Sequence, residues 1–342
     1  MGVESVIFIR RDNIGDLVCT TPAISATRRN FPDARIGVLV NSYNADVVVD
    51  NPDIDEVFVY EKEKHSLSKG KLRVLLSNLN LIRKVRAAKY EIAIGCSYGY
   101  SKRVERYASL TGAKTKIGFA PKGGTGSYNK PVPEPEKAIH EVEAMMRLVE
   151  PLGIKGPPPP LRLIPDEKEI EKVSKDLRRL GLSQRERPII FHISSRKPQN
   201  RWPKEKFRVL GDMIYERHGL NIILLWSPGA GANPLHPGDD ENAEWLFNNM
   251  KKRPFALKTE KLSELIAATS LGHMAVCSDG GAMHIAAALR KPVLTIWGST
   301  DKTRWAPWGV AHAILQDGTG EAGSVGVDEA FKAFDKLYSK YR

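Results

Sequence analysis

The fold is decided by the stretch Ser278-Asp279-Gly280-Gly281-Ala282-Met283-His284-Ile285-Ala286-Ala287-Ala288-Leu289. The apolar run at 274–277 before it predicts a buried strand, and its alanine-rich part predicts a helix that ends near Lys291-Pro292. A strand, a glycine turn and a helix N-terminus leave backbone N–H groups free, and the helix dipole favours negative charge there. The glycines let a phosphate approach the backbone without a Cβ in the way. The stretch therefore indicates an anion site, with an ordinary turn that binds nothing as the alternative.

The alternation of strand and helix continues through the rest of the chain, which is typical of mostly parallel sheets covered by helices on both faces. A Gly-Pro run at 156–160 breaks the alternation and is typical of a stiff linker between domains. We therefore predict an α/β protein with two Rossmann-like domains, residues 1–156 and 161–325, followed by a helix at 326–342. Apolar segments predict strands at 6–9, 35–40, 57–60, 92–95, 115–119, 188–193, 221–226, 274–277 and 293–297.

Two segments of the first half complete this outline. One helix is expected at 17–29, directly after the first strand and its turn. The segment 121–135 is rich in Gly, Pro, Lys and Ser and is expected to be a long loop. Long loops in compact domains are often functional or mobile.

Length and composition limit the class of protein. The chain has 342 residues, which favours two domains over a single core. Hydrophobic residues make up 42% and charged residues 27%, values typical of a soluble globular protein. No apolar run approaches the roughly 20 residues needed to cross a bilayer, and the start of the chain predicts a strand rather than a signal peptide. Three widely separated cysteines, Cys19, Cys96 and Cys277, indicate free thiols in a reducing cytoplasm and no metal cluster.

The formal net charge is +12, an excess that attracts nucleic acid, anionic lipid or an acidic small substrate. Lys and Arg are dispersed, with denser groups at 62–86 and 196–206. Because there is no zinc finger, RNP motif or basic region with heptads, we predict no nucleic-acid partner. The charge favours an anionic membrane surface or a phosphate-rich partner, with a plain solvated basic surface as the alternative.

Asp16 follows Gly15 at the start of a helix, directly after the first strand. A carboxylate there is stabilised by the helix N-terminus and stays ionised at neutral pH. It either caps the helix or acts as a general base that faces an interdomain cleft, a role worth about 10²–10⁴-fold in rate. Ligands bind open α/β sheets beyond the carboxyl ends of strands, and Asp16 and Gly280 both lie at such ends, one in each half. Such a pairing is what a two-substrate enzyme requires.

Other candidate residues lie in the second half. The segment 192–203 follows a strand and carries hydroxyl and guanidinium groups that could hold phosphate oxygens, unless it is only a basic surface loop. Within it, His192 is expected to be structural. His284 could donate a hydrogen bond to a phosphate or pack beneath the loop. Asp279 could bind a ligand hydroxyl or cap its turn.

Two absent motifs argue against two classes of enzyme. There is no GxxxxGK[ST], which argues against an ordinary P-loop kinase or ATPase. The first strand is not followed by GxGxxG, which argues against a nicotinamide or flavin enzyme.

Together these stretches resemble glycosyltransferase family 9, the ADP-heptose:lipopolysaccharide heptosyltransferases. The likeness covers nearly the whole chain in the same order, and the glycine-turn motif is its most specific part. The matching stretches are Arg11-Asp12-Asn13-Ile14-Gly15-Asp16 with Thr21-Pro22-Ala23, then Arg201-Trp202-Pro203, then Asp279 to Ala288 with Lys291-Pro292, and finally Gly298-Ser299-Thr300-Asp301.

The resemblance implies a GT-B fold, in which two Rossmann-like domains face each other across a cleft and the last helix returns to the first domain. It implies a metal-independent, inverting transfer of heptose or a related sugar from a nucleotide-diphosphate donor, ADP-heptose, to a lipopolysaccharide core or similar glycan. No cofactor is implied. The enzyme would be cytoplasmic and peripheral on the inner face of the inner membrane. A nucleotide-sugar epimerase or hydrolase on the same fold is the alternative, and a nucleic-acid-binding protein is a more distant one.

The resemblance also implies roles for particular residues. Asp16 is similar to the general base, and the backbone of Gly280 to Met283, with His284, to the diphosphate cradle. The family usually has a lysine just before or near the Trp-Pro pair, and here the residues before the pair are Asn200 and Arg201. The resemblance therefore gives the phosphate-binding role to Arg201, with Arg196 and Lys197 as competitors. Where the family has Asp-Thr/Ser-Gly, this chain has Asp279-Gly280-Gly281, which removes a hydroxyl but keeps the amides. The predicted donor-binding residues are Ser194, Ser195, Arg196, Arg201, Asp279, Gly280, Gly281, Ala282, Met283 and His284, the predicted acceptor-binding residues are Asn13, Gly15 and Lys122, and no metal ligand is predicted.

Overall fold

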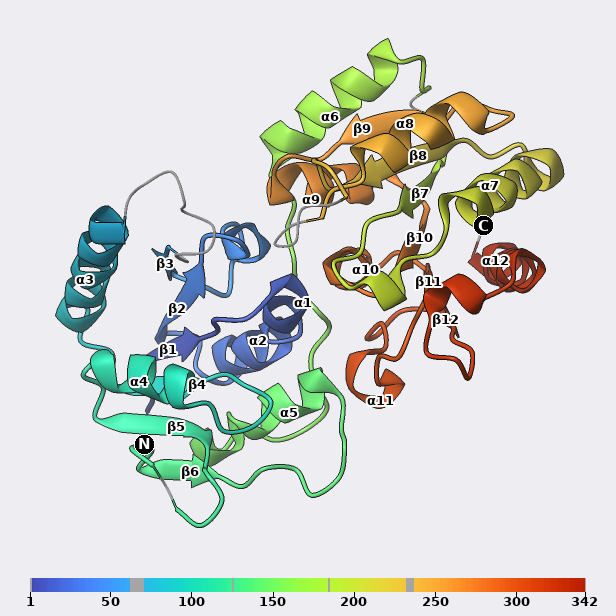
Figure 1. Cartoon of the computed structure of the whole chain (residues 1–342). Coiled ribbons are helices and arrows are strands. Elements are labelled where there is room, and N and C mark those ends of the chain that lie inside the picture. The colour runs from blue at the N-terminus through green and yellow to red at the C-terminus, as the bar shows by residue number, and fades with distance from the viewer. Residues whose placement is uncertain (1, 62–70, 125, 184, 232–236, 342) are drawn as a thin grey trace. The chain divides into compact units, whose positions relative to one another are not determined.

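The computed structural model describes residues 2–61, 71–124, 126–183, 185–231 and 237–341 (Figure 1). The chain divides into two compact units, Met1–Ile164 and Pro165–Arg342. Each unit is built on a six-stranded sheet whose neighbouring strands all pair in parallel. The architecture is therefore the predicted α/β class with two Rossmann-like units.

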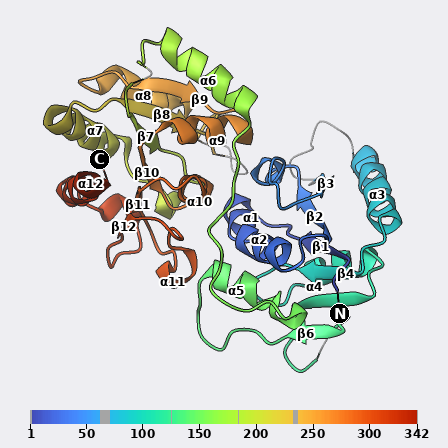
Figure 2. The ribbon, with the colours of Figure 1, turned by 180° about the vertical axis from the view of Figure 1, so that it is seen from behind.

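The first unit alternates strands and helices. Its elements are β1 (Ser5–Ile9), α1 (Ile14–Val18), α2 (Thr21–Asn30), β2 (Arg35–Asn41), a 3-10 turn (Ala45–Val47), β3 (Glu56–Tyr60), α3 (Lys71–Ala87), β4 (Ile92–Gly95), α4 (Lys102–Leu110), β5 (Thr115–Phe119), β6 (Lys130–Val132), α5 (Glu141–Arg147) and a second 3-10 turn (Glu150–Leu152). The strand order is β3-β2-β1-β4-β5-β6. All of β1 is buried, because helices cover both faces of the sheet. Side chains of α3 and α4 share a hydrophobic cluster with Ile7 and Ile9, whereas α1, α2 and α5 lie on the opposite face (Figure 2).

The second unit repeats this plan. Its elements are α6 (Glu167–Arg179), β7 (Ile189–His192), a 3-10 turn (Pro198–Asn200), α7 (Lys204–His218), β8 (Ile222–Trp226), α8 (Asp240–Asn249), β9 (Phe255–Lys258), α9 (Leu262–Leu271), β10 (Met274–Ser278), α10 (Gly281–Ala288), β11 (Val293–Ile296), α11 (Lys302–Trp305), β12 (His312–Leu315), another 3-10 turn (Ala322–Ser324) and α12 (Val327–Tyr341). The strand order β12-β11-β10-β7-β8-β9 is the order of the first sheet written in reverse. Its core lies between the sheet and α7, α8 and α12.

The segment predicted as one helix at 17–29 forms two helices, α1 and α2. Pro22 lies in the first turn of α2, where it lacks the N–H that would continue α1. The hydroxyl of Thr20 donates to the carbonyl of Asp16 at 2.8 Å, and that of Thr21 donates to the carbonyl of Val18 at 2.7 Å. These bonds satisfy carbonyls at the end of α1, so the chain can turn there.

The loop predicted at 121–135 contains β6, and β9 and β12 were also missed. Each of the three strands lies at the edge of its sheet. The loop is anchored by Tyr128, which is 3% exposed and lies directly beneath Gly118. A Cβ on Gly118 would lie 2.2 Å from the tyrosine ring, so this close approach requires glycine.

The division between the units falls after Ile164 rather than at 156–160. Residues beyond the proline run still belong to the first unit, because Arg162 forms an ion pair with Asp53 at 2.9 Å. In addition, the backbone N–H of Arg162 donates to the hydroxyl of Thr21 at 3.0 Å. The linker is therefore fixed along part of its length.

The last helix differs from the prediction that it returns to the first domain. Helix α12 contacts α7, β11 and β12, and belongs to the second unit. Its buried side chains Ala330, Phe334 and Leu337 are part of the core of that unit. The amphipathic pattern of α12 is thus explained by burial against the sheet of its own unit. Within the described ranges, none of the helices combines the length and apolarity that a membrane span needs.

Candidate active site

The sequence-predicted residues lie at the carboxyl ends of strands in both units. Each sheet reverses its strand order at one point, between β1 and β4 in the first unit and between β7 and β10 in the second. Asp16 follows β1, the segment from Ser194 follows β7, and Gly280 follows β10. Such switch points are where open α/β sheets bind ligands.

Asp16 is the third residue of α1 and is 8% exposed. Its Oδ2 accepts hydrogen bonds from the backbone N–H of Asn13 at 2.9 Å and from the Asn13 side-chain amide at 3.1 Å. Its Oδ1 accepts one from Nη2 of Arg10 at 2.7 Å. Burial by itself would raise the pKa of Asp16, but the charge of Arg10 and the bonds from Asn13 outweigh it and lower the pKa. Asp16 therefore both caps α1 and remains an ionised carboxylate.

Arg10 is completely buried, and sequence reasoning missed it. Nη2 donates both to Asp16 and to Oε1 of Glu141 at the start of α5, each at 2.7 Å. Nη1 lies 3.1 Å from Sδ of Met145, and Nε lies 3.4 Å from a carboxylate oxygen of Asp12. Burial opposes the charge, but Glu141, Asp16 and Asp12 together raise the pKa of Arg10. The sequence does give one sign of Arg10, because a charged residue directly follows the apolar run of β1. Its partner Glu141 lies too far along the chain to be found from the spacing of motifs.

The three predicted acceptor-binding residues do not all lie close to Asp16. Asn13 contacts Asp16 directly, and Gly15 is buried inside α1. Lys122 is exposed in the loop that follows β5, two strands from β1 in the sheet. All three lie at the carboxyl edge of the first sheet, but only Asn13 and Gly15 lie beside the carboxylate.

The glycine turn before α10 is open. A Cβ built on Gly280 meets nothing within 4 Å, so the space above its backbone is free. Among the backbone bonds of the described residues, none is donated by the N–H groups of Gly281, Ala282 or Met283. The side chains of Ala282 and Met283 are buried, so these two residues offer a ligand their backbone rather than their side chains. The turn therefore has the geometry of an anion site.

Asp279 accepts hydrogen bonds from residues that follow the two strands on either side of β10. Its Oδ2 accepts hydrogen bonds from the side-chain amide of Asn200 at 2.8 Å and from the hydroxyl of Thr300 at 2.7 Å. Its backbone carbonyl accepts one from the hydroxyl of Ser195 at 3.3 Å. These contacts join the segments that follow β7, β10 and β11. Sequence reasoning did not assign Asn200 to the site, although it neighbours the Arg-Trp-Pro motif.

Arg201 contacts the segment that follows β7 and the start of α8. Its Nε donates to the carbonyl of Ser195 at 2.8 Å, and its Nη1 lies 3.6 Å from a carboxylate oxygen of Asp239. The hydroxyl of Ser194 accepts a hydrogen bond from the backbone N–H of Ser227 at 2.9 Å. Arg201 and Ser194 therefore already have protein partners, whereas the competing cations Arg196 and Lys197 are exposed.

Two histidines lie nearby, and both are buried. His284, in the first turn of α10, is 3% exposed, and its ring packs against that of Trp305 in a T-shaped arrangement with the ring centroids 5.7 Å apart. His192 ends β7, and burial lowers its pKa to about 4. His192 is thus neutral at pH 7.

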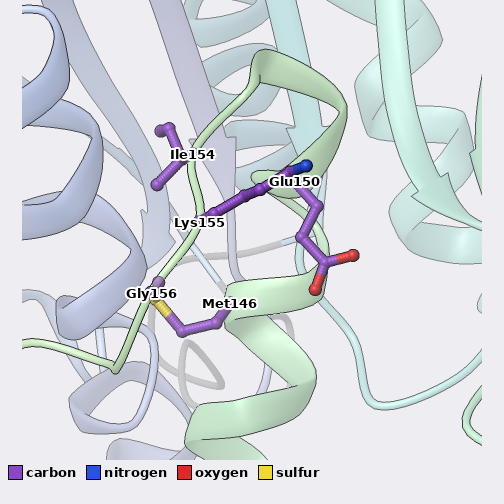
Figure 3. A pocket seen from close by; sticks show the side chains of 5 residues that line it. All are labelled: Met146, Glu150, Ile154, Lys155 and Gly156. Atoms are coloured by element: carbon purple, nitrogen blue, oxygen red, sulfur yellow. The ribbon is translucent and has the colours of Figure 1, made fainter.

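A hollow of about 320 Å³ lies elsewhere in the first unit, lined by Met146, Glu150, Ile154, Lys155 and Gly156 (Figure 3). It contains none of the predicted site residues. Met146 faces this hollow, whereas its neighbour Met145 contacts Arg10. Over the described ranges, no three His, Cys, Asp or Glu side chains gather in a way that could hold a metal ion.

Two Rossmann-like units, each with its candidate residues at the switch point of the sheet, are the architecture of the GT-B class. Residues 78–332 match the model of glycosyltransferase family 9 (heptosyltransferase), and the chain belongs to this family. This match confirms the family that the sequence motifs indicated, and with it the glycosyltransferase class.

Individual relatives agree. The chain is 25% identical over 300 residues to lipopolysaccharide heptosyltransferase 3 of Escherichia coli K12, covering 86% of this chain and 82% of that protein. A glycosyltransferase family 9 structure from Veillonella parvula has a TM-score of 0.86 at 20% identity and covers 99% of both chains. The E. coli heptosyltransferase WaaC with ADP has a TM-score of 0.73 at 16% identity, covering 98% of this chain and 99% of that one. The two structures confirm the fold.

Proposed function

We propose that the protein transfers a heptose, or a related sugar, from ADP-heptose to a lipopolysaccharide core or similar glycan, with inversion at the anomeric carbon. The observation that carries the proposal is the state of Asp16: a nearly buried carboxylate, kept ionised, at the switch point of the first sheet. One of its oxygens accepts two of the hydrogen bonds described above and the other accepts one, which leaves room for an acceptor hydroxyl.

In the proposed reaction the acceptor hydroxyl donates its proton to Asp16 while its oxygen attacks the anomeric carbon of the donor. The bond from that carbon to the diphosphate breaks, and ADP leaves with the electron pair. A single displacement of this kind inverts the configuration. Asp16 here supplies general base catalysis, typically about 10²–10⁴-fold in rate.

The leaving diphosphate would lie against the glycine turn of the second unit. Backbone N–H groups of Gly281 to Met283 and the N-terminus of α10 favour negative charge there. Exposed Arg196 and Lys197 can approach the phosphates, and Arg201 keeps their segment in place through Ser195. These protein cations and amides support a transfer that needs no metal ion. The adenine of the donor is supported by the ADP named for the related WaaC structure.

The acceptor side would be completed by Asn13 and Gly15, with Lys122 contacting acidic groups farther along the glycan. A lipid-linked acceptor would also place the enzyme on an anionic membrane surface, in the cytoplasm. Helix α3 supports this placement, because it contains five Lys and Arg residues and no acidic one. Its Leu76 and Leu79 are 58% and 53% exposed. Residues 62–70 of the same basic stretch lie outside the described residues.

The proposal is tested by incubating the protein with ADP-heptose, with and without a heptose-bearing core oligosaccharide. We expect ADP release that depends on the acceptor and a product whose new linkage has the anomeric configuration opposite to that of the donor. Nuclear magnetic resonance of the product reports the configuration. Sugar release or isomerisation at the same rate without acceptor would instead support a hydrolase or an epimerase.

A further inference from the structure

We propose that Glu141, acting through Arg10, is a positioning residue that sets how strongly Asp16 attracts the proton of the acceptor hydroxyl. The inference rests on the proposed role of Asp16 as the base. Glu141 lies 125 positions beyond Asp16 in the numbering, on α5, and its side chain is completely buried.

The geometry puts one cation between two carboxylates. A single nitrogen, Nη2 of Arg10, donates to Oδ1 of Asp16 and to Oε1 of Glu141, each at 2.7 Å. The two carboxylate oxygens can therefore be no more than twice that distance apart. The Arg10 side chain is 1% exposed and that of Glu141 is 0% exposed, so water screens this arrangement poorly.

The other groups around Arg10 and Asp16 have a smaller effect on this balance. Asp12 lies on the Nε side of Arg10, and its side chain is 44% exposed, so its charge is screened. Cys96 follows β4, and burial raises the pKa of its thiol to about 12, which keeps it neutral. Asn13 is uncharged. The competition for Arg10 is thus chiefly between Asp16 and Glu141.

This competition has a chemical consequence. Arg10 paired with Asp16 alone would stabilise the carboxylate strongly and make it a weak base. Glu141 takes half of the hydrogen bonding of Nη2, and its negative charge opposes that of Asp16, so Asp16 becomes a stronger base. When Asp16 accepts the proton, Arg10 keeps an anionic partner and is not left as an isolated buried charge.

The first test changes the cation. Activity requires ionised Asp16 and is lost as pH falls through the pKa of that group. Arg10→Gln removes the positive charge, so we expect the acid limb of kcat/KM against pH to move up by about one unit or more. Arg10→Lys keeps the positive charge, so its acid limb should lie close to that of the unchanged protein. An unmoved limb in folded Arg10→Gln would overturn the inference. Should Arg10→Gln fail to fold, Arg10→Lys and the Glu141 variant below carry the test.

The second test changes the other carboxylate. Glu141→Gln keeps the shape and the acceptor oxygen but removes the charge. We expect kcat to fall about tenfold at neutral pH, because a weaker base accepts the proton less well, while the KM for the donor stays unchanged. In an Asp16→Asn background the same Glu141→Gln change should have no further effect on kcat.

Different results would contradict the role of Asp16 and the role of Glu141. If Asp16→Asn alone retains full activity, the proposed base is wrong and the inference goes with it. If Asp16→Asn is inactive but Glu141→Gln lowers the melting temperature without lowering kcat, only the inference fails. Equal losses from Glu141→Gln with and without Asp16 would show a purely structural role, which also overturns it.

Discussion

Arg10 and Trp297 have the largest side chains that are completely buried among the described residues. For a tryptophan this is ordinary, but a buried guanidinium must be matched by anions and hydrogen bonds. Arg10 has Asp16 and Glu141 at 2.7 Å each. Removing one partner of such a pair typically costs about 3–5 kcal/mol, but replacing the whole buried group by packed apolar residues is often neutral or stabilising. Stability alone is therefore a weak reason for such a cluster to be present. A functional role for the cluster is the more economical explanation.

At the same scale, the buried His192 leads to a prediction about how the free energy of unfolding changes with pH. Its pKa is about 4 when folded and about 6.5 when unfolded, so the unfolded chain gains a proton first as pH falls. Stability from this group is complete above pH 6.5 and is lost between pH 6.5 and pH 4, by about 3 kcal/mol. In His192→Gln that loss should disappear. Urea unfolding at pH 7 and at pH 4.5 measures it, and parallel losses in the two proteins would contradict the buried neutral imidazole.

The site shows which residues a sequence can reveal. Asp16, Asp279 and the glycine turn lie in contiguous motifs, and the chemistry of those motifs depends on local backbone geometry. Arg10 with Glu141, and Asn200 with Asp279, are pairs whose members are far apart in the chain. Only the folded sheet brings them together. Arg201 was assigned to phosphate binding from its motif, but its contacts with Ser195 and Asp239 depend on the same long-range packing.

At the scale of elements, what was missed follows from burial. Central strands such as β1 and β10 are buried on both faces and are continuous apolar runs, so they were predicted. The missed strands β6, β9 and β12 are edge strands of three or four residues, each with at least one exposed residue. Their formation depends on pairing with a neighbour rather than on their own pattern. The same reasoning explains α12, whose apolar face could not reveal which unit it covers.

Helix α3 leads to a prediction at this scale. Its exposed Leu76 and Leu79, together with five Lys and Arg residues on the helix, should hold the protein on vesicles that contain anionic lipid. Replacing both leucines by serine should weaken binding about tenfold, because less apolar surface enters the interface. Cosedimentation with phosphatidylglycerol vesicles measures this. Leu180→Ser, equally exposed at 55% on the second unit, is the matched control and should bind like the unchanged protein. Equal binding of all three proteins would remove α3 from the interface.

At the scale of the whole molecule, the two units have the same strand order, and in each unit the candidate residues lie at the switch point of the sheet. The first unit offers a carboxylate at its switch point. The second offers the amides of Gly281 to Met283, which donate none of the backbone bonds found in the described part of the chain. A carboxylate suits the removal of a proton, and amides suit a diphosphate. The family to which the chain belongs gives this division of labour its expected chemistry, the transfer of a sugar.

The most direct measurement is the turnover of Asp16→Asn at saturating ADP-heptose and acceptor, with the affinity for ADP measured by calorimetry on the same preparation. We expect a loss of turnover of at least about a hundredfold, because the base is gone. We expect an unchanged affinity for ADP, because the proposed nucleotide site lies in the second unit. Turnover equal to that of the unchanged protein would contradict the central claim.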